Sequence, residues 1–441
     1  MIVFFCYLIL ISITLYTIVI SKILYNKCQS LIPIVPILVI YFWSIYGAWT
    51  WIPFKLNGET YFYEDMMYTV NVDVYYCLSL LYYSIFIVIF GNYVLTFALR
   101  RRKYLSETYY RSVYMCYIER LTFSRGYHFV MYVMLFVFLY FSYSDIYHAL
   151  RSGVSAYQLS RFDSTTEGLN SLISFCGNTF VYLSVPLLFS KNFKKKIPVL
   201  LGFSIYYFFN FMLGNRNILL CGMIVAVLLY SELYGVKKAL KLKNICFFII
   251  LVLIIQIISI FRGFSADAMF SSGFKINISD ILMSLFTSSE QYCAQFSMYG
   301  ALKYDVDFTY GSSILFLMST LIPSFLGFER PMAIYQHFIK NTVGSADLGM
   351  TINHATGWYL NFGIVGIVIG AWLWGYILKY FYCRKKSFIY LYGAVTFSSS
   401  AIQMIRDGGI EAYKSGLLLD TIIPLSIIWW FTKRNRKSLS I

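Results

Sequence analysis

The chain has 441 residues, of which 59% are hydrophobic and only 13% are charged. Soluble domains carry about 25% charged and about 45–50% apolar residues, so this composition excludes a soluble globular protein and a disordered chain. In a soluble protein the formal net charge of +16 would suggest nucleic acid. In a membrane protein, basic residues near span ends first report orientation, and no nucleic-acid partner is expected.

Continuous apolar runs of about 20 residues predict an all-α, polytopic integral membrane protein with about 11 transmembrane helices, within a range of about 10–12. The predicted spans are 2–20, 33–52, 75–98, 127–148, 170–189, 197–213, 217–234, 244–261, 357–382, 388–405 and 413–431. The shorter apolar run 310–326 contains Pro323, which predicts a re-entrant or surface-lying segment. No second domain is visible, so residues 1–441 are interpreted as a single membrane-embedded domain.

Basic clusters follow the odd-numbered spans and predict how the chain is oriented. They include Lys22 and Lys27, Arg100–Lys103, Lys191–Lys196, Lys237–Lys243 and Arg384–Lys386. Because cytoplasmic loops are enriched in Lys and Arg, the N-terminus is predicted to be periplasmic and the C-terminus cytoplasmic. The longest outer segment is 262–356, which exceeds an ordinary connector and is expected to be folded and functional. Within it, Ser271–Ser289 and Pro331–Lys340 have a helical pattern.

The outer loops hold an unexpected set of arginines. These are Arg151, Arg161, Arg216, Arg262, Arg330 and Arg406. Several convergent guanidinium groups would form a site for a phosphate or diphosphate, because the planar fork binds such oxygens bidentately. The alternative is that each arginine lies at the membrane interface and pairs with the outer acidic residues.

Arg216 is the sharpest case. It follows Gly214 in a tight turn between two apolar helices, and it falls in the first turn of the second helix. A fixed cation beside the N–H groups of a helix N-terminus predicts an anion site at the outer membrane surface. For Arg406, pairing with its neighbour Asp407 inside the turn is a strong alternative.

His354 lies in the polar segment Thr351–Gly357, just before a predicted span. Histidine is the commonest general base, so His354 is a candidate base, with a purely structural role as the alternative. Asp305 and Asp307 form a weak metal-binding string, and no metal site is expected. The nine cysteines are interpreted as packing residues. Asp420, deep in the last span, would pair with an arginine or belong to a proton path.

Several short segments carry a family resemblance when they are taken in order. They are Gly214-Asn215-Arg216, the stretch from Ile322-Pro323-Ser324-Phe325 to Glu329-Arg330-Pro331, Asn353-His354, Gly363 and Gly366, and Arg406-Asp407-Gly408 with Glu411. The pattern resembles the Wzy-type O-antigen polymerases, which are relatives of the O-antigen ligases, and it is especially similar to enterobacterial common-antigen polymerases. One departure is Asn215, where the family more often has Ser or Thr.

The resemblance implies an inverting glycosyltransferase of the membrane-embedded type C class that needs neither metal nor cofactor. It would act at the periplasmic face of the bacterial inner membrane, among membrane lipids. The donor would be a growing glycan on undecaprenyl diphosphate, and the acceptor a lipid-linked oligosaccharide repeat unit. A chain-length regulator protein is a further implied partner.

The resemblance also implies roles for individual residues. Arg216, Arg262 and Arg330 would stabilise the diphosphate leaving group, and His354 would take the proton from the attacking hydroxyl. Arg161 and Arg406 would contact diphosphate or substrate. Two alternatives stay open: an O-antigen ligase that transfers glycan to lipid A-core, and a flippase or other transporter. A transporter would be expected to carry charges within its spans and internal repeats, whereas this chain has few charges in its spans and no visible repeat.

Overall fold

The fold was analysed in a computed structural model that describes residues 1–58, 68–99, 107–152, 167–213, 217–244, 246, 250, 289–320, 330–344 and 351–434. The chain divides into two compact units, and each is described by itself. Unit 1 is Met1–Arg101, Phe286–Cys383 and Ser400–Leu417, and unit 2 is Arg102–Leu285, Arg384–Ser399 and Leu418–Ile441. The prediction of one membrane-embedded domain stays a prediction.

The first helix, α1 (Ile2–Cys28), shows why these apolar runs form membrane helices. One stripe at helical spacing is buried and consists of Cys6, Leu10, Ile13, Thr17, Ile20 and Leu24. A second stripe is exposed although it is apolar, and includes Phe4, Leu8, Ile11, Leu15 and Ile18. A helix that is apolar on both its packed face and its exposed face is suited to hydrocarbon surroundings.

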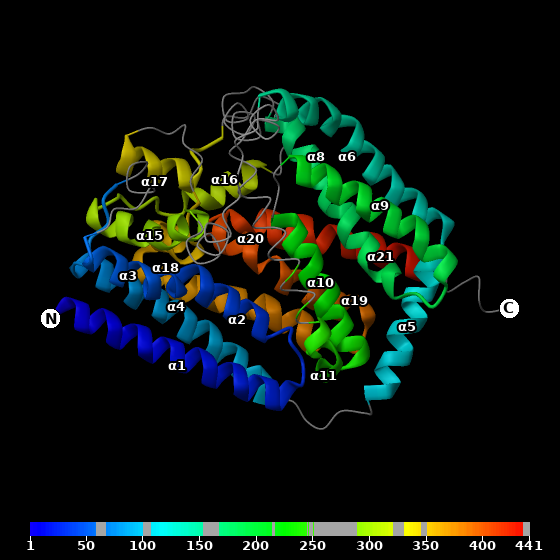
Figure 1. Cartoon of the computed structure of the whole chain (residues 1–441), viewed down its shortest axis with the longest axis horizontal. Coiled ribbons are helices and arrows are strands. Elements are labelled where there is room, and N and C mark those ends of the chain that lie inside the picture. The colour runs from blue at the N-terminus through cyan, green and yellow to red at the C-terminus, as the bar shows by residue number, and fades with distance from the viewer. Residues whose placement is uncertain are drawn as a thin grey trace, which may run out of the picture. The chain divides into compact units, whose positions relative to one another are not determined.

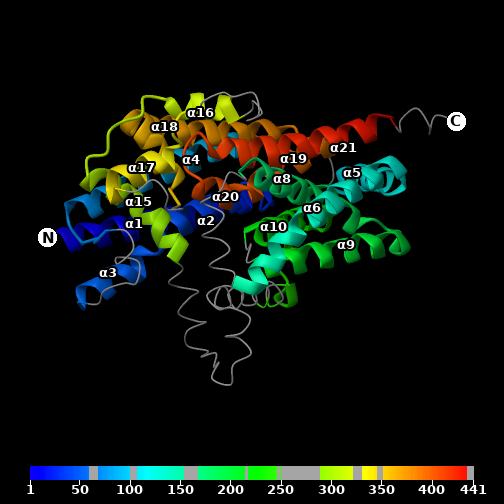
Figure 2. The same cartoon turned by 90° about the horizontal axis from the view of Figure 1, so that it is seen from above.

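Unit 1 is a bundle in which α1 and α18 pack against α4 (Figure 1). Its other elements are α2 (Ile34–Tyr41), η1 (Phe42–Tyr46), α3 (Ala48–Leu56), α4 (Val74–Leu99), α15 (Ser289–Lys303), α16 (Ser312–Thr320), α17 (Ile334–Val343), α18 (His354–Cys383), α20 (Ala401–Arg406) and the beginning of η4 (Lys414–Ile422). Both α15 and α17 contact α18 and each other, and they lie close to it in Figure 2.

A kink interrupts α18 close to its N-terminal end. Phe362 and Gly363 leave helical geometry, and Gly363 has a φ of 62°, which glycine adopts without strain. The carbonyl of Leu360 accepts a 2.8 Å hydrogen bond from the backbone N–H of Thr309, in the loop before α16. This loop therefore satisfies a backbone group near the break. The kink separates the first turns of α18 from the longer apolar part that follows.

Unit 2 contains the remaining helices: α5 (Glu107–Phe123), α6 (Arg125–Ser152), α8 (Glu167–Ser184), η2 (Val185–Phe189), α9 (Phe193–Met212), α10 (Asn217–Tyr234), α11 (Val236–Ala239), α19 (Phe388–Ser399) and α21 (Ile423–Arg434). Helices α8 and α9 pack against α6, while α21 packs against α19 and α8. Asp420 accepts a 3.0 Å hydrogen bond from the side-chain amide of Asn178. This buried acid therefore has a side-chain amide as one of its partners, and its pairing with an arginine stays a prediction.

Seven helices among the described residues are long and apolar enough to cross a membrane: Ile2–Cys28, Ile34–Leu56, Val74–Phe97, Arg125–Tyr143, His354–Cys383, Phe388–Arg406 and Lys414–Lys433. Each coincides with a predicted span. The predicted spans 170–189 and 217–234 coincide with the shorter apolar helices Ile173–Phe189 and Leu220–Tyr234. The all-α, polytopic fold class is therefore confirmed, whereas most of 244–261 lies outside the described residues.

The shorter outer elements also bear on the sequence predictions. The run 310–326 includes the nine-residue helix α16, which is too short to cross a membrane, while 321–329 lies outside the described residues. Helix α17 overlaps the predicted helical segment Pro331–Lys340. The predicted helix Ser271–Ser289 falls almost entirely outside the described residues.

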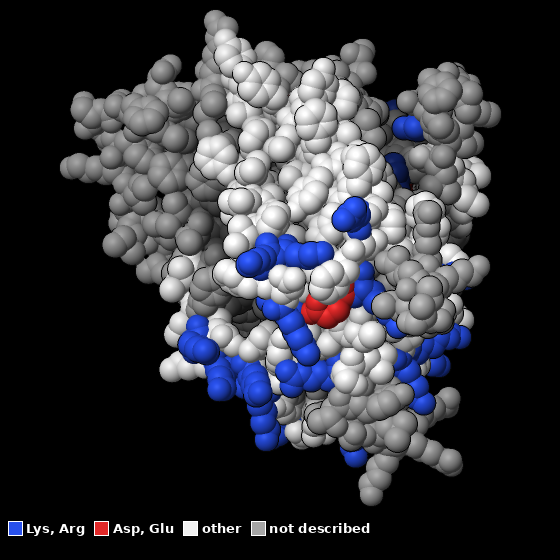
Figure 3. Space-filling model, turned by 90° about the vertical axis from the view of Figure 1, so that its right-hand side faces the viewer, with Lys and Arg blue, Asp and Glu red and all other residues white. Residues whose placement is uncertain are grey.

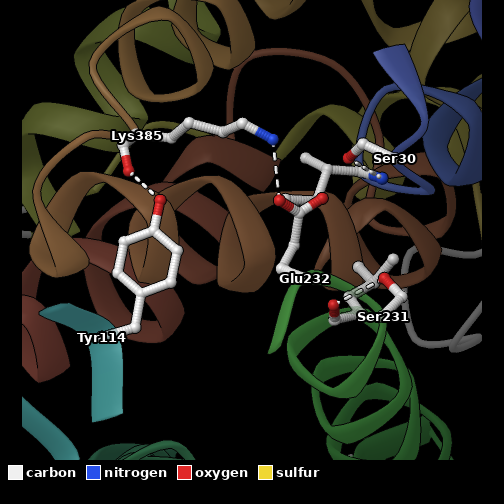
Figure 4. Close-up of polar contacts among 7 residues, drawn as sticks. Ser30, Tyr114, Ser231, Glu232 and Lys385 are labelled. Carbon is white, nitrogen blue, oxygen red and sulfur yellow. Dashed lines mark hydrogen bonds and ion pairs between the residues drawn. The ribbon is translucent and has the colours of Figure 1, made fainter. Parts of the chain in front are cut away.

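Basic residues of unit 2 are exposed in the connections that the sequence predicts to be cytoplasmic. Examples are Lys191, Lys194, Lys237, Lys238 and Lys386. Figure 3 shows one face of the molecule, with many Lys and Arg side chains and little Asp or Glu. Beside them, the ammonium of Lys385 forms a 2.7 Å ion pair with Glu232 at the end of α10, and its carbonyl accepts a hydrogen bond from Tyr114 (Figure 4). These contacts fix the turn between α18 and α19 within unit 2.

Candidate functional site at the N-terminal end of α18

Two segments that are about 50 residues apart in the sequence lie side by side before α18. The backbone N–H of Ile352 donates a 3.1 Å hydrogen bond to the carbonyl of Arg406, and Ile352 pairs with Asp407 in a short parallel bridge. The side chain of Asn353 then accepts the N–H of Ala355 at 3.0 Å and so caps the helix. The turn after α20 is therefore held against the start of α18.

Glycines allow these two segments to come into backbone contact. A Cβ atom on Gly357 would lie closer than 3.0 Å to the backbone of Gly408 and Gly409. Gly408 and Gly409 also have φ values of 75° and 41°, which L side chains rarely adopt. We call residues 352–361, 406–411, 330–334 and Ser313 the α18 N-terminal cluster. All of it belongs to unit 1.

Buried hydrogen bonds connect the start of α18 to neighbouring helices of unit 1. The amide of Asn353 donates to the hydroxyl of Ser44 at 2.9 Å, and its backbone N–H donates to Ser297 at 3.1 Å. The hydroxyl of Thr356 lies 2.9 Å from that of Ser297 and 3.1 Å from that of Tyr83. Because buried polar groups are costly unless they are paired, this network fixes the first turn of α18 against η1, α4 and α15.

His354 is completely buried at the start of α18. Its Nε2 accepts a 3.1 Å hydrogen bond from the indole N–H of Trp358, so the proton of the neutral ring is on Nδ1. The backbone of Met404, in α20, also interacts with the imidazole. The rings of Phe86, Trp374 and Tyr413 surround the imidazole.

These contacts bear on the predicted chemistry of His354. The sequence placed it in a polar segment at the bilayer surface, whereas the folded chain encloses its ring among aromatic side chains. To accept a proton through Nε2, the ring would first have to lose the hydrogen bond from Trp358. The role of His354 as a general base stays a prediction.

Arg406 and Asp407 form an ion pair within the turn that follows α20. Nε of Arg406 lies 3.1 Å from Oδ1 of Asp407, and the hydroxyl of Ser415 donates to Oδ2 at 3.3 Å. This is the self-paired turn that the sequence offered as the alternative for Arg406. A substrate contact by Arg406 stays a prediction, since the guanidinium remains partly exposed and presents five donors in all.

Glu411 joins three elements of the cluster. Its Oε1 accepts a 2.8 Å hydrogen bond from the N–H of Ile334, at the start of α17, and its carboxylate also accepts from the hydroxyl of Ser313 in α16. Burial of the carboxylate raises the pKa of Glu411 to about 7, although both hydrogen bonds and nearby Lys414 act in the opposite direction. A partly exposed carboxylate that titrates near neutral pH can hold or release a proton.

Of the remaining predicted arginines, Arg330 is the one whose side chain is described. Arg330 is exposed and lies four residues before Ile334, so the Glu411 contact brings its segment to the cluster. Arg161, Arg216 and Arg262 lie outside the described residues. Arg151 lies in the last turn of α6, and its side chain is not described. Convergence of these arginines on one diphosphate stays a prediction.

Two features escaped the sequence assignment of site residues. Glu411 was part of the family resemblance but received no role, because nothing in its local sequence reveals the burial that shifts its pKa. Gly357 received no role either. The Gly408-Gly409 pair was a usable signal, since adjacent glycines mark a turn that another backbone can approach closely.

Asp305 and Asp307, which form the weak metal-binding string, lie in the loop before α16. The backbone carbonyl of Asp307 accepts a hydrogen bond from His337 at 3.0 Å, and Asp305 has a φ of 46°. Among the described residues, no group of three or more His, Cys, Asp or Glu side chains is placed to hold a metal ion.

The fold and the cluster define a polytopic helical membrane protein whose polar, glycine-packed site lies at one end of a long apolar helix. The family model of the O-antigen polysaccharide polymerase Wzy matches residues 1–438, and the chain belongs to this family. Its general activity is therefore O-antigen polymerisation, a glycosyltransferase reaction on lipid-linked oligosaccharide repeat units. Comparisons with curated proteins and with solved structures found no match.

Proposed function

We propose that the protein joins lipid-linked oligosaccharide repeat units at the periplasmic face of the inner membrane. In each cycle the growing glycan moves from undecaprenyl diphosphate to a new lipid-linked repeat unit. The observation that carries this proposal is the family match over nearly the whole chain. It is supported by the α18 N-terminal cluster, where Ile352, directly before the family-like pair Asn353-His354, makes backbone contact with Arg406 and Asp407 of the second family-like segment.

The proposed reaction is an inverting displacement at the anomeric carbon of the donor. A hydroxyl of the acceptor sugar attacks, and the electron pair of the broken bond passes to the diphosphate oxygen. Negative charge develops on that leaving group, and arginine guanidinium groups would stabilise it without a metal ion. Arg216, Arg262 and Arg330 are the proposed leaving-group contacts, and Arg161 and Arg406 are proposed to bind diphosphate or substrate. The sequence predicted that His354 accepts the proton, and a chain-length regulator protein is a proposed partner.

The proposed reaction can be tested with the purified full-length protein in liposomes. The substrate would be undecaprenyl-diphosphate-linked single repeat units extracted from a deletion strain that lacks this protein. We expect a ladder of longer glycans still attached to undecaprenyl diphosphate, with or without a metal chelator. Transfer only after lipid A-core is added would identify a ligase instead, and movement of the substrate across the bilayer without elongation would identify a transporter.

The proposed orientation makes a separate prediction, because it decides on which face the cluster lies. Tyr310 is 82% exposed in the loop before α16, and the native Cys116 and Cys383 are exposed on helices at the predicted cytoplasmic side. A membrane-impermeant maleimide should label Tyr310→Cys in cells with a permeabilised outer membrane, in a variant whose half-buried Cys77 is replaced by Ser. It should label Cys116 and Cys383 only after the inner membrane is opened. Labelling of these two cysteines in intact inner membranes would reverse the orientation.

A further inference from the structure

Glu411 stands at the end of a directed chain of hydrogen bonds. The amide of Asn361, in α18, donates to the hydroxyl oxygen of Ser313 at 3.1 Å, and the Ser313 hydroxyl in turn donates to the Glu411 carboxylate. The N–H of Ile334 donates to the same carboxylate at 2.8 Å. Both donors hold the carboxylate in one orientation, and both favour its ionised form.

Two donors do not exhaust the carboxylate. An ionised carboxylate offers about four lone-pair positions, and the Glu411 side chain is partly exposed. His354 differs on both counts, because its ring is fully buried and its Nε2 lone pair is engaged by Trp358. Compared with His354, Glu411 is thus the side chain that keeps lone pairs and part of its surface available to an incoming hydroxyl.

Charged neighbours have a smaller effect on the pKa of Glu411 than burial does. Lys414 acts on it weakly, after burial and the two hydrogen bonds. Arg406 already has a carboxylate partner in its own turn, and His337 of α17 contacts the backbone carbonyl of Asp307, in the loop before α16. Arg330 precedes α17 and is exposed. Because burial dominates and raises the pKa of Glu411 to about 7, the carboxylate matches the neutral range in which a general base works best.

Within the polymerase function proposed above, we propose that Glu411 accepts the proton of the attacking sugar hydroxyl, with Ser313 and the N-terminus of α17 holding its carboxylate in position. As the hydroxyl oxygen forms its bond to the anomeric carbon of the donor glycan, the O–H electron pair stays on that oxygen and the proton passes to Glu411. The bond between the anomeric carbon and the diphosphate oxygen breaks, and undecaprenyl diphosphate leaves with that electron pair. Glu411 then releases the proton to water, and the carboxylate is restored.

The matched substitution is Glu411→Gln, because its amide oxygen can still accept the hydrogen bond from Ile334, whereas the amide cannot take a proton. General-base catalysis contributes about 10²–10⁴-fold, so the polymerisation rate should fall by at least about 100-fold while the thermal unfolding midpoint stays unchanged. For the unaltered protein, the rate should fall about tenfold per pH unit below about pH 7, because protonated Glu411 cannot act as a base. The assay is elongation of extracted undecaprenyl-diphosphate-linked repeat units in liposomes, between about pH 5.5 and 8.5.

Two further variants separate this role from a structural one. Ser313→Ala removes a donor that favours the ionised carboxylate, so it should move the acidic limb of the pH–rate profile to higher pH. His354→Gln keeps an acceptor for the indole of Trp358 and should lower the rate much less than Glu411→Gln. If Glu411→Gln fails to fold, the pH–rate profile of Ser313→Ala serves as the test. An acidic limb at the same pH as in the unaltered protein would contradict the role of Glu411 as the base.

Two results would overturn the proposed role of Glu411 or reassign it. A Glu411→Gln rate within about fivefold of the unaltered protein overturns the inference, and an accompanying loss of about 100-fold in His354→Gln returns the proton to His354. If the unaltered protein elongates no glycan at any pH, the polymerase function itself fails, and the Glu411 role fails with it. The inference alone fails when the unaltered protein elongates normally and the variant does so too.

Discussion

Replacing Arg216 by Ala is expected to lower polymer formation by about 10²–10³-fold, the usual cost of removing one charge-stabilising donor from a transition state. The arginine directly follows the Gly214-Asn215 turn and immediately precedes α10, which begins at Asn217. A cation there acts together with the partial positive charge of the helix N-terminus on a diphosphate that gains charge as it leaves. Rates of glycan elongation, measured on equal amounts of folded protein, give the size of the effect.

Arg216→Lys distinguishes a bidentate contact from a simple charge requirement. Lysine provides a point charge and cannot reproduce the planar fork, so it should restore only a small part of the rate. Arg151→Ala is the matched control, since Arg151 is also predicted to be on the outer side but has no proposed contact. Normal long chains from a well-expressed Arg216→Ala protein would show that Arg216 only anchors the helix at the membrane interface.

The membrane helices were predictable because their signal is local. A run of about 20 apolar residues is sufficient to predict a span, and α1, α4 and α18 follow those runs. The break at Phe362 and Gly363 was not predicted, because an isolated glycine in an apolar run is compatible with a straight helix. The break is favoured here by Thr309, which lies far from Gly363 in the sequence and supplies its N–H to the carbonyl of Leu360.

The candidate site was only partly predictable, for a related reason. The segments around His354 and Arg406 could each be singled out from residue type, but their contact depends on a backbone hydrogen bond between Ile352 and Arg406. Periodicity contains no information about such a contact. The burial of His354 likewise comes from Phe86 on α4 and from Trp374, which lies beyond the break at Phe362 and Gly363, and not from its polar neighbours.

The same tertiary packing explains why Glu411 was overlooked. In the sequence it is one of several outer carboxylates, and its distinction arises only when Ile334 and Ser313 surround it. Burial and hydrogen bonding shift its pKa in opposite directions, and only the folded geometry decides which effect is larger. A sequence pattern can therefore point to the turn between α20 and η4 without identifying the chemistry of this side chain.

Gly357→Ala is expected to destabilise the protein by about 1–3 kcal/mol, the usual cost of overpacking. The added methyl group would meet the backbone of Gly408 and Gly409 closer than 3.0 Å, and backbone atoms cannot rotate away as a side chain can. The turn that carries Arg406 and Glu411 would have to move, so elongation should fall along with the thermal unfolding midpoint measured in detergent.

Gly202→Ala, in α9, is the matched control for this prediction. Its methyl group would approach only the side chains of Phe180 and Leu135, at 3.1 Å and 3.3 Å, and these can shift slightly. Alanine is favoured over glycine inside a helix by about 1 kcal/mol, so Gly202→Ala should leave the midpoint unchanged or raise it. The two substitutions are chemically identical, yet only Gly357→Ala should lower the midpoint and the elongation rate. Equal midpoints and equal elongation rates for the two variants would mean that the turn after α20 does not depend on its close approach to α18.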